Sequence, residues 1–298
     1  MRFSHVRKCA ALAACVIGLS VMAFAKGTTA EPAAVVAGRP ALLNDAFNAL
    51  VEDQGCWAFT ETHNGVRDGK PRGETIFRFD PSVTYTEQRI PLKIGGKPPT
   101  EKQLKEAADR GERDAKRRFE QQQKLPATPE EPEAPATEDK PKVRRADEVK
   151  LWVNGQLVTP EIDRAKVVLE DETSVTYEVP MHPEGKGDAS AMLDKFELTA
   201  RVNKVSCQFE RATIRQRAPL RVKLIAKITD TLLVFEFSTP NPRYPSVLTK
   251  ATADVQVALF FGKPRAMHNE MVRTELRHVK PYDDRFKVKS GKTRTIEL

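Results

Sequence analysis

The chain has little cysteine, few aromatic residues and little glycine. Only four of its 298 residues are cysteine, 15 are glycine and 7% are aromatic. Beyond the first 25 residues it contains no apolar run of 18 residues, so no membrane-spanning helix is expected there. A chain with 40% hydrophobic and 30% charged residues is typical of a globular protein. This composition excludes global disorder, a fibrous repeat and a polytopic membrane protein.

The motifs of common catalytic and metal sites are also missing. The sequence has no His-Glu-x-x-His, no Gly-x-Ser-x-Gly and no Ser-x-x-Lys motif. Gly95-Gly96-Lys97 is followed by Pro98, where a phosphate-binding loop needs Ser or Thr to hold magnesium. The sequence therefore predicts no metal and no cofactor, and it favours a protein that is not an enzyme. A catalytic site assembled from distant residues stays open.

The first 25 residues have the pattern of an export signal. Basic residues occur in Met1–Lys8, an apolar stretch follows in Cys9–Phe24, and Ala23–Ala25 forms the small-x-small pattern that precedes cleavage. The pattern predicts a signal peptide over 1–25 and a periplasmic or secreted mature protein. The tetrapeptide 12–15 resembles a lipoprotein box, but cleavage there would leave an unexplained apolar start to the mature chain.

Removal of this signal leaves two cysteines, Cys56 and Cys207, in an oxidising compartment. Both are expected in strands, where they form either a disulfide or a pair of buried thiols. Two cysteines alone cannot complete a tetrahedral metal site, which needs four ligands.

Positive charge is concentrated in the second half of the chain. The formal net charge is +8, and residues 149–298 carry 25 basic and 19 acidic residues. An exported basic protein meets anionic lipid or wall polymer, so nucleic acid is excluded as an expected partner. One interpretation is a face that binds an anionic envelope component; the other is an ordinary solvated strand face. The residues of this predicted anionic-partner face are Arg217, Arg221, Lys223 and Lys227.

Three segments follow the signal. Residues 26–100 are expected to hold a helix from Leu42 to Val51 and a hairpin of strands 56–62 and 74–79, with a turn at Asn64-Gly65. Residues 101–148 are expected to form a charged helix, begun by a capping box at Thr100–Gln103, and then a proline-rich linker.

Residues 149–298 alternate between apolar and polar side chains almost throughout. Examples of expected strands are 195–202, 220–228, 253–261 and 272–276. One apolar face per strand indicates a sheet packed on one side only. The predicted fold is therefore mainly β (α+β): a large curled antiparallel sheet or open half-barrel, packed on one or two helices.

The apolar faces of these strands carry large side chains that one short helix cannot cover. We expect them to line a ligand cavity or to form a closed core. The candidate cavity residues are Trp57, Phe59, Phe77, Phe79, Leu233, Phe235, Phe237, Leu259 and Phe261.

The N-terminal part of the chain resembles a known group of proteins. An export signal, a Leu/Phe-rich helix and the strand 57–62 (Trp-Ala-Phe-Thr-Glu-Thr) that leads to Glu74–Pro81 resemble uncharacterised secreted proteins of Gram-negative bacteria. More distantly, this order is similar to the periplasmic carriers of the lipoprotein-localisation pathway. That resemblance implies an unclosed antiparallel barrel around helices, with an apolar cavity for acyl chains. Residues 101–148 depart from it, because the carriers lack such an insertion.

Two functions are consistent with these patterns. The first is a non-enzymatic periplasmic binding or carrier protein for an acyl-chain (lipid) or other apolar ligand. The second is an envelope structural or interaction protein that docks an anionic partner through its basic strand face.

Overall fold

The computed structural model describes residues 40–124, 151–153, 156–183, 194–222, 226–259 and 263–282. The predicted signal peptide (1–25), the linker (125–142) and the site candidates Lys223 and Phe261 lie outside the described residues. Within the described segments, no helix is both long enough and apolar enough to cross a membrane.

The fold is mainly β, with two helices, which confirms the predicted class. Helices are α2 Ala41–Asp53 and α3 Glu101–Lys124, with short 3-10 helices at Gln54–Cys56 and Ile162–Arg164. The first strands are β1 Trp57–Arg67, β2 Lys70–Pro71, β3 Thr75–Phe79, β4 Arg89–Lys93, β5 Leu151–Val153, β6 Gln156–Pro160, β7 Lys166–Glu170 and β8 Ser174–Val179. They are followed by β9 Met181–Pro183, β10 Phe196–Asn203, β11 Gln208–Gln216, β12 Leu220–Val222, β13 Ala226–Ser238, β14 Val247–Leu259 and β15 Arg265–His278.

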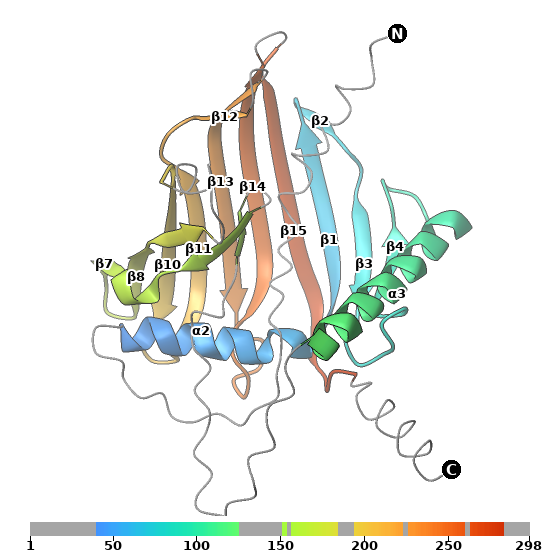
Figure 1. The fold of residues 1–298 in the computed structure, drawn as a ribbon, viewed down its shortest axis with the longest axis horizontal. Coiled ribbons are helices and arrows are strands. Elements are labelled where there is room, and N and C mark those ends of the chain that lie inside the picture. The colour runs from blue at the N-terminus through green and yellow to red at the C-terminus, as the bar shows by residue number, and fades with distance from the viewer. Residues whose placement is uncertain are drawn as a thin grey trace, which may run out of the picture. The chain divides into compact units, whose positions relative to one another are not determined.

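Twelve strands form one antiparallel sheet that does not close into a barrel. Its main path is β4-β3-β1-β15-β14-β13-β11-β10-β8-β7, with β2 added to β1 and β12 added to β13. β5, β6 and β9 form a separate three-stranded sheet. Figure 1 shows β10, β11, β13 and β14 side by side.

The chain divides into two compact units, each discontinuous in sequence. Unit 1 holds residues 1–54, 63–73 and 136–272, and unit 2 holds 55–62, 74–135 and 273–298.

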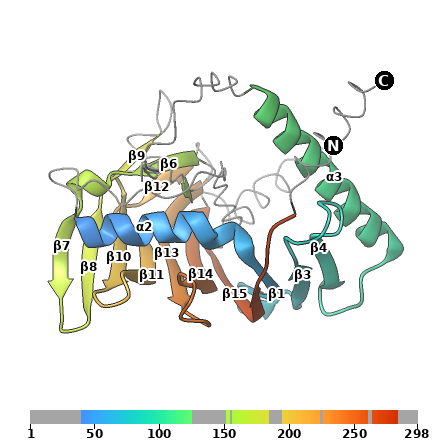
Figure 2. The same ribbon diagram turned by 90° about the horizontal axis from the view of Figure 1, so that it is seen from below.

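The core of unit 1 lies between α2 and one face of the sheet. α2 packs against β10 and β11 and runs across them (Figure 2). Its Leu43 and Phe47 are 0% and 5% exposed. Strand β10 alternates strictly between buried and partly exposed residues, as the sequence predicts for a sheet packed on one side. The α2 bounds extend the predicted helix by one residue at its start and two at its end.

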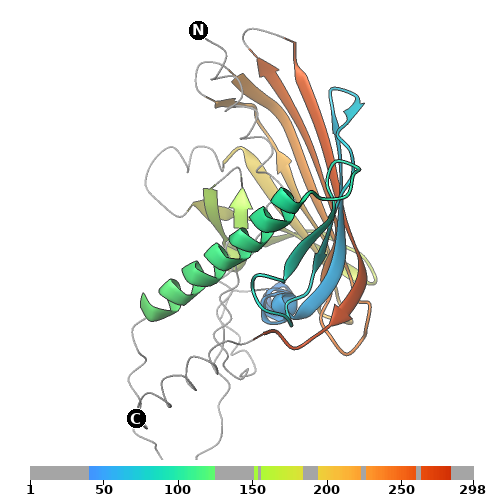
Figure 3. The same ribbon diagram turned by 90° about the vertical axis from the view of Figure 1, so that its right-hand side faces the viewer.

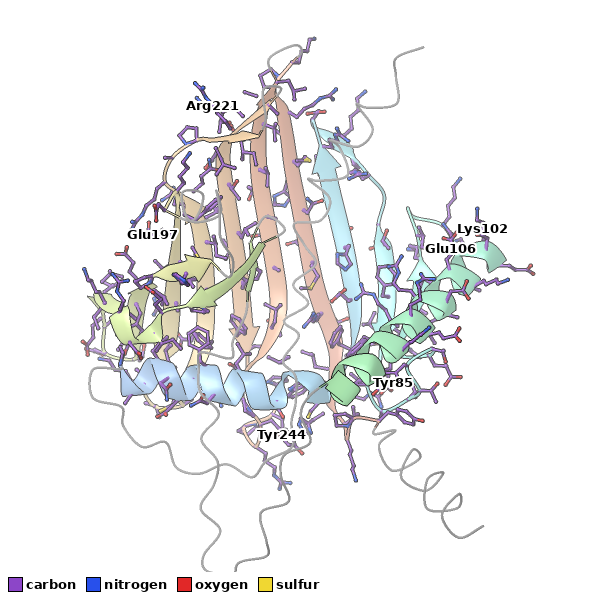
Figure 4. All side chains as sticks on the ribbon, in the orientation of Figure 1. Tyr85, Lys102, Glu106, Glu197, Arg221 and Tyr244 are labelled. Carbon is purple, nitrogen blue, oxygen red and sulfur yellow. The ribbon has the colours of Figure 1, made fainter. Side chains whose placement is uncertain are left out.

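In unit 2, α3 packs against β4 (Figure 3). The predicted capping box is confirmed: the Gln103 backbone N–H donates to Thr100 Oγ1 at 3.3 Å, and the Thr100 N–H donates to Gln103 Oε1 at 2.9 Å. The exposed side of α3 carries the ion pair of Lys102 with Glu106 (Figure 4). This helix is charged, as predicted, but Gly111 contacts the backbone at Tyr85 so closely that no Cβ would fit.

The predicted turn at Asn64-Gly65 is wrong. Strand β1 continues to Arg67, and the hairpin turns at Asp68-Gly69, where both residues have positive φ angles of 53° and 76°. Asp-Gly is a favoured pair for such a two-residue turn. Gly65 instead leaves room for a neighbouring side chain, because a Cβ there would lie 2.9 Å from the Asn269 side-chain oxygen.

The predicted continuous strand over 220–228 is also wrong. Residues 220–222 form β12, which folds back on the start of β13, so that Leu220 pairs with Ile228. Thr229 and Asp230 lie inside β13, at an irregularity of the ladder with β14. Two short antiparallel strands show the same alternation as one long strand, so the pattern does not distinguish them.

Candidate functional site

The clearest cluster of functional side chains lies in unit 2, on the face of β1 that carries Trp57 and Phe59. These two candidate cavity residues are 2% and 8% exposed. Phe79 of β3 packs against Phe59, with 5.0 Å between ring centroids. Phe77 and Phe79 are both partly buried. We call Phe59, Phe77 and Phe79 the aromatic face of unit 2.

The other candidate cavity residues belong to unit 1. Leu233 and Phe235 are 4% and 8% exposed, and both are part of the core cluster beside α2. Phe237 is partly buried, packs on that core and lies 5.7 Å from the Phe209 ring. Leu259 is partly buried on β14. The nine predicted residues thus do not form one described cluster: four lie in unit 2, four in unit 1 and Phe261 outside the described residues.

An acid lies at the next position of the apolar stripe on β1. Glu61 follows Trp57 and Phe59 at alternate positions and is only 4% exposed. Its Oε1 accepts a hydrogen bond from Arg89 Nη2 at 2.9 Å, and its Oε2 accepts one from Arg273 Nε at 3.0 Å. Strands β4, β1 and β15 each contribute one member of this Arg–Glu–Arg cluster.

Both guanidinium groups also cover aromatic rings. Arg273 lies over Phe59 with its guanidinium carbon 4.1 Å from the ring centroid, and Arg89 lies over Phe77 at 4.3 Å. Such contacts stabilise a cation on the ring face, most strongly where water is excluded. The aromatic face and the Arg–Glu–Arg cluster are therefore one site, apolar on one side and charged on the other.

The two arginines differ in their exposure. The Arg273 side chain is 14% exposed and that of Arg89 is 46% exposed. Burial lowers the pKa of Arg273, Glu61 opposes this effect, and the positive charge of Arg89 adds to it. Arginine nevertheless stays protonated near neutral pH. Two guanidinium groups and one carboxylate leave this cluster with one net positive charge.

None of these three residues was predicted from the sequence. The sequence does mark Glu61, because this acid follows Trp57 and Phe59 at the next alternate position of β1. Arg273 was missed because Val272, Thr274 and Leu276 were expected to face the core. In the structure Met271 is 4% exposed and pairs with the core residue Ala251, and Arg273, two residues further on, bonds to Glu61 on the inward side; the alternation is then interrupted at Glu275, which has a φ angle of 54°. A shift of one residue moves every side chain of a strand to the other face.

The predicted anionic-partner face is partly occupied by acids of neighbouring strands. Arg217 donates to Glu197 from Nε at 3.1 Å and also to Glu178. These hydrogen bonds, first that to Glu197, raise the pKa of Arg217. Arg221 and Lys227 are exposed and pair directly across β12 and β13. Figure 4 labels Glu197 and Arg221 on this part of unit 1.

A second network in unit 1 joins β8, β10 and β11. Arg201 donates to Glu210 at 2.9 Å and to Asp171 at 3.0 Å. Burial alone would raise the pKa of Glu210, but hydrogen bonds from Asn203, Ser174 and Arg201 outweigh it, and the pKa lies below its ordinary value. Every member of this network has a protein partner, so we assign it to the stability of the fold.

The two cysteines are not where the alternation placed them. Cys56 ends a 3-10 helix and Cys207 lies in the turn between β10 and β11, with a φ angle of 54°. Both are partly buried thiols, and no disulfide joins them.

Comparison of this chain with protein-family models, with curated proteins and with solved structures finds no match.

Proposed function

We propose that the protein is a non-enzymatic binding or carrier protein for an acyl-chain or other apolar ligand, exported to the periplasm or secreted. The observation that carries the proposal is the aromatic face of unit 2. Phe77 and Phe79 stay partly open beside the buried Phe59, on the same face as the Arg–Glu–Arg cluster. Ligand sites combine a mainly apolar lining with a few charged groups in this way.

The alternative, an interaction protein that docks an anionic partner, has less support. Arg217 is already bonded to two carboxylates, which leaves Arg221 and Lys227 as the exposed pair on β12 and β13. Two like charges directly opposite each other destabilise a sheet, so this pair does favour an anion nearby.

The test is uptake of N-phenyl-1-naphthylamine, a neutral apolar dye that fluoresces when it leaves water. We expect the purified protein to bind the dye and Phe77→Ala to weaken binding by roughly tenfold, because truncation removes apolar contact area. Phe237→Ala is the matched control, since it removes the same side chain from a partly buried position of unit 1. Absence of dye binding by the unmodified protein, with no lipid co-extracted in mass spectrometry, would refute the proposal.

A further inference from the structure

The charge of the Arg–Glu–Arg cluster is not balanced within the described part of unit 2. The charged groups that act on Arg273 are Glu61, which attracts it, and Arg89, which repels it. Lys93, on the same strand as Arg89, is paired with Glu74 at 2.7 Å. Glu61 is thus shared by two guanidinium groups.

Another acid of β15 lies on the opposite side of β1. Glu275 accepts a hydrogen bond from the Thr60 hydroxyl. Thr60 alternates with Phe59 and Glu61 along the strand, so its side chain points to the other face of the sheet. Glu275 therefore does not neutralise the cluster on the aromatic face.

The unbalanced charge is carried to the surface by Arg89. Arg273 is almost fully covered between Glu61 and Phe59, whereas nearly half of the Arg89 side chain is open to solvent. A guanidinium group has five N–H donors in a planar fork, which suits a carboxylate or phosphate. Its hydrogen bond to Glu61 and its stacking on Phe77 fix the plane of that fork.

We infer that the site of unit 2 binds a singly anionic amphiphile, whose carboxylate or phosphate pairs with Arg89 and whose apolar chain lies along Phe77 and Phe79. This inference rests on the proposed function and adds the charge of the ligand to it. The ligand supplies the negative charge that the cluster lacks. Glu61 holds both arginines in place and is a positioning residue.

The experiment compares three ligands of equal chain length as competitors of N-phenyl-1-naphthylamine: dodecanoate, dodecyl phosphate and dodecan-1-ol. We expect both anions to displace the dye about tenfold more strongly than the alcohol, because a hydrogen bond to a charged group contributes more than one to a neutral group. Similar displacement of the dye by the two anions would show that the site recognises the negative charge alone, and a difference in displacement would identify the preferred head group.

Arg89→Gln removes the exposed charge and should abolish the preference for anions while it leaves the alcohol unaffected. Arg89→Lys keeps the charge without the fork and should retain part of the preference. Arg78→Gln is the matched control: it removes one exposed arginine from β3, where Arg78 pairs with Ile90 rather than with a member of the aromatic face. This control should behave as the unmodified protein does.

The outcomes separate the two proposals. Dye binding without a preference for anions, or a preference that survives Arg89→Gln, overturns this inference and leaves the proposed function standing. If the dye does not bind, binding of dodecanoate is measured directly by isothermal titration calorimetry: binding that depends on Arg89 supports the inference and restricts the proposed function to acyl chains, whereas absence of binding overturns both proposals. If Arg89→Gln does not fold, a salt titration of the unmodified protein decides: NaCl should weaken binding of dodecanoate but not of dodecan-1-ol.

Discussion

Replacement of Glu61 by Gln should lower the free energy of unfolding of unit 2 by about 3 kcal/mol, because it leaves Arg273 buried without its counter-ion. Glu61 is 4% exposed, and its Oε2 accepts the Arg273 Nε–H at 3.0 Å. The loss of one partner of a buried ion pair costs about 3–5 kcal/mol. We take the lower end because the Gln amide oxygen can still accept one hydrogen bond.

The second ion pair of Glu61 adds little to this value. The Arg89 side chain is 46% exposed, and an ion pair with a solvated partner contributes about 1 kcal/mol or less. When Glu61 is lost, water can solvate Arg89, whereas Arg273 at 14% exposure stays covered. The size of the effect is therefore set by Arg273.

The assay is urea unfolding followed by the fluorescence of Trp57, in a Trp152→Phe background so that the signal comes from unit 2 alone. Trp57 is 2% exposed and packs edge-on against His278, with ring centroids 5.3 Å apart, so its emission should change on unfolding. Glu61→Gln combined with Arg273→Met should be more stable than Glu61→Gln alone, because no unpaired buried charge remains. A loss below about 1 kcal/mol for Glu61→Gln, or no recovery in the double variant, would refute this reasoning.

Three further predictions concern other parts of the fold. Gly111→Ala should destabilise the protein although alanine favours helices, because its Cβ would lie less than 3.0 Å from the Tyr85 carbonyl oxygen. The rate of hydrogen exchange at the Tyr85 amide should therefore rise, and an unchanged rate would contradict the close packing. Thr231→Val should cost about 1–3 kcal/mol in urea unfolding, because the buried Gln216 oxygen loses the hydroxyl that donates to it; a neutral result would mean that water replaces the hydroxyl. The pKa of Glu210 is lower in the folded protein, so its carboxylate stabilises the fold above the ordinary pKa of 4.5, and this stabilisation is lost as the pH falls through the folded pKa. Glu210→Gln should flatten the pH dependence of the free energy of unfolding in that pH range. An equally steep profile in the variant would assign the pH dependence to other groups.

The class of the fold follows from local patterns that the structure leaves intact. The apolar stripe of α2 predicts a helix and the alternation of β10 predicts a strand. In each case the predicted element is also the one that turns the apolar residues toward the core, so local pattern and burial favour the same structure. The capping box at Thr100 is equally local, since both of its hydrogen bonds join residues three apart. Features that depend on neighbours in sequence were therefore predictable.

The candidate site depends on partners far apart in sequence, and alternation alone does not identify them. Glu61 and Arg273 are separated by 212 positions. The sequence 271–276 (Met-Val-Arg-Thr-Glu-Leu) allows two registers but favours the wrong one, because one set of alternate residues contains both Val272 and Leu276 and the other contains Met271 as its apolar residue. A buried carboxylate on β1 decides between them, since it places Arg273 rather than Val272 on the inward face. The site therefore forms only in the register of β15 that turns Arg273 toward Glu61.

The same dependence on neighbouring strands changes what the basic composition means. Residues 149–298 have a net positive charge, yet Arg201 and Arg217 each bond to two carboxylates that other segments supply. Their charge is compensated in the folded sheet, so a run of basic residues in the sequence does not become a basic surface of equal strength. At the Arg–Glu–Arg cluster the ratio is reversed, because two arginines share one carboxylate. A single unbalanced charge beside an aromatic face is therefore a stronger basis for ligand recognition than the larger number of arginines that are already paired.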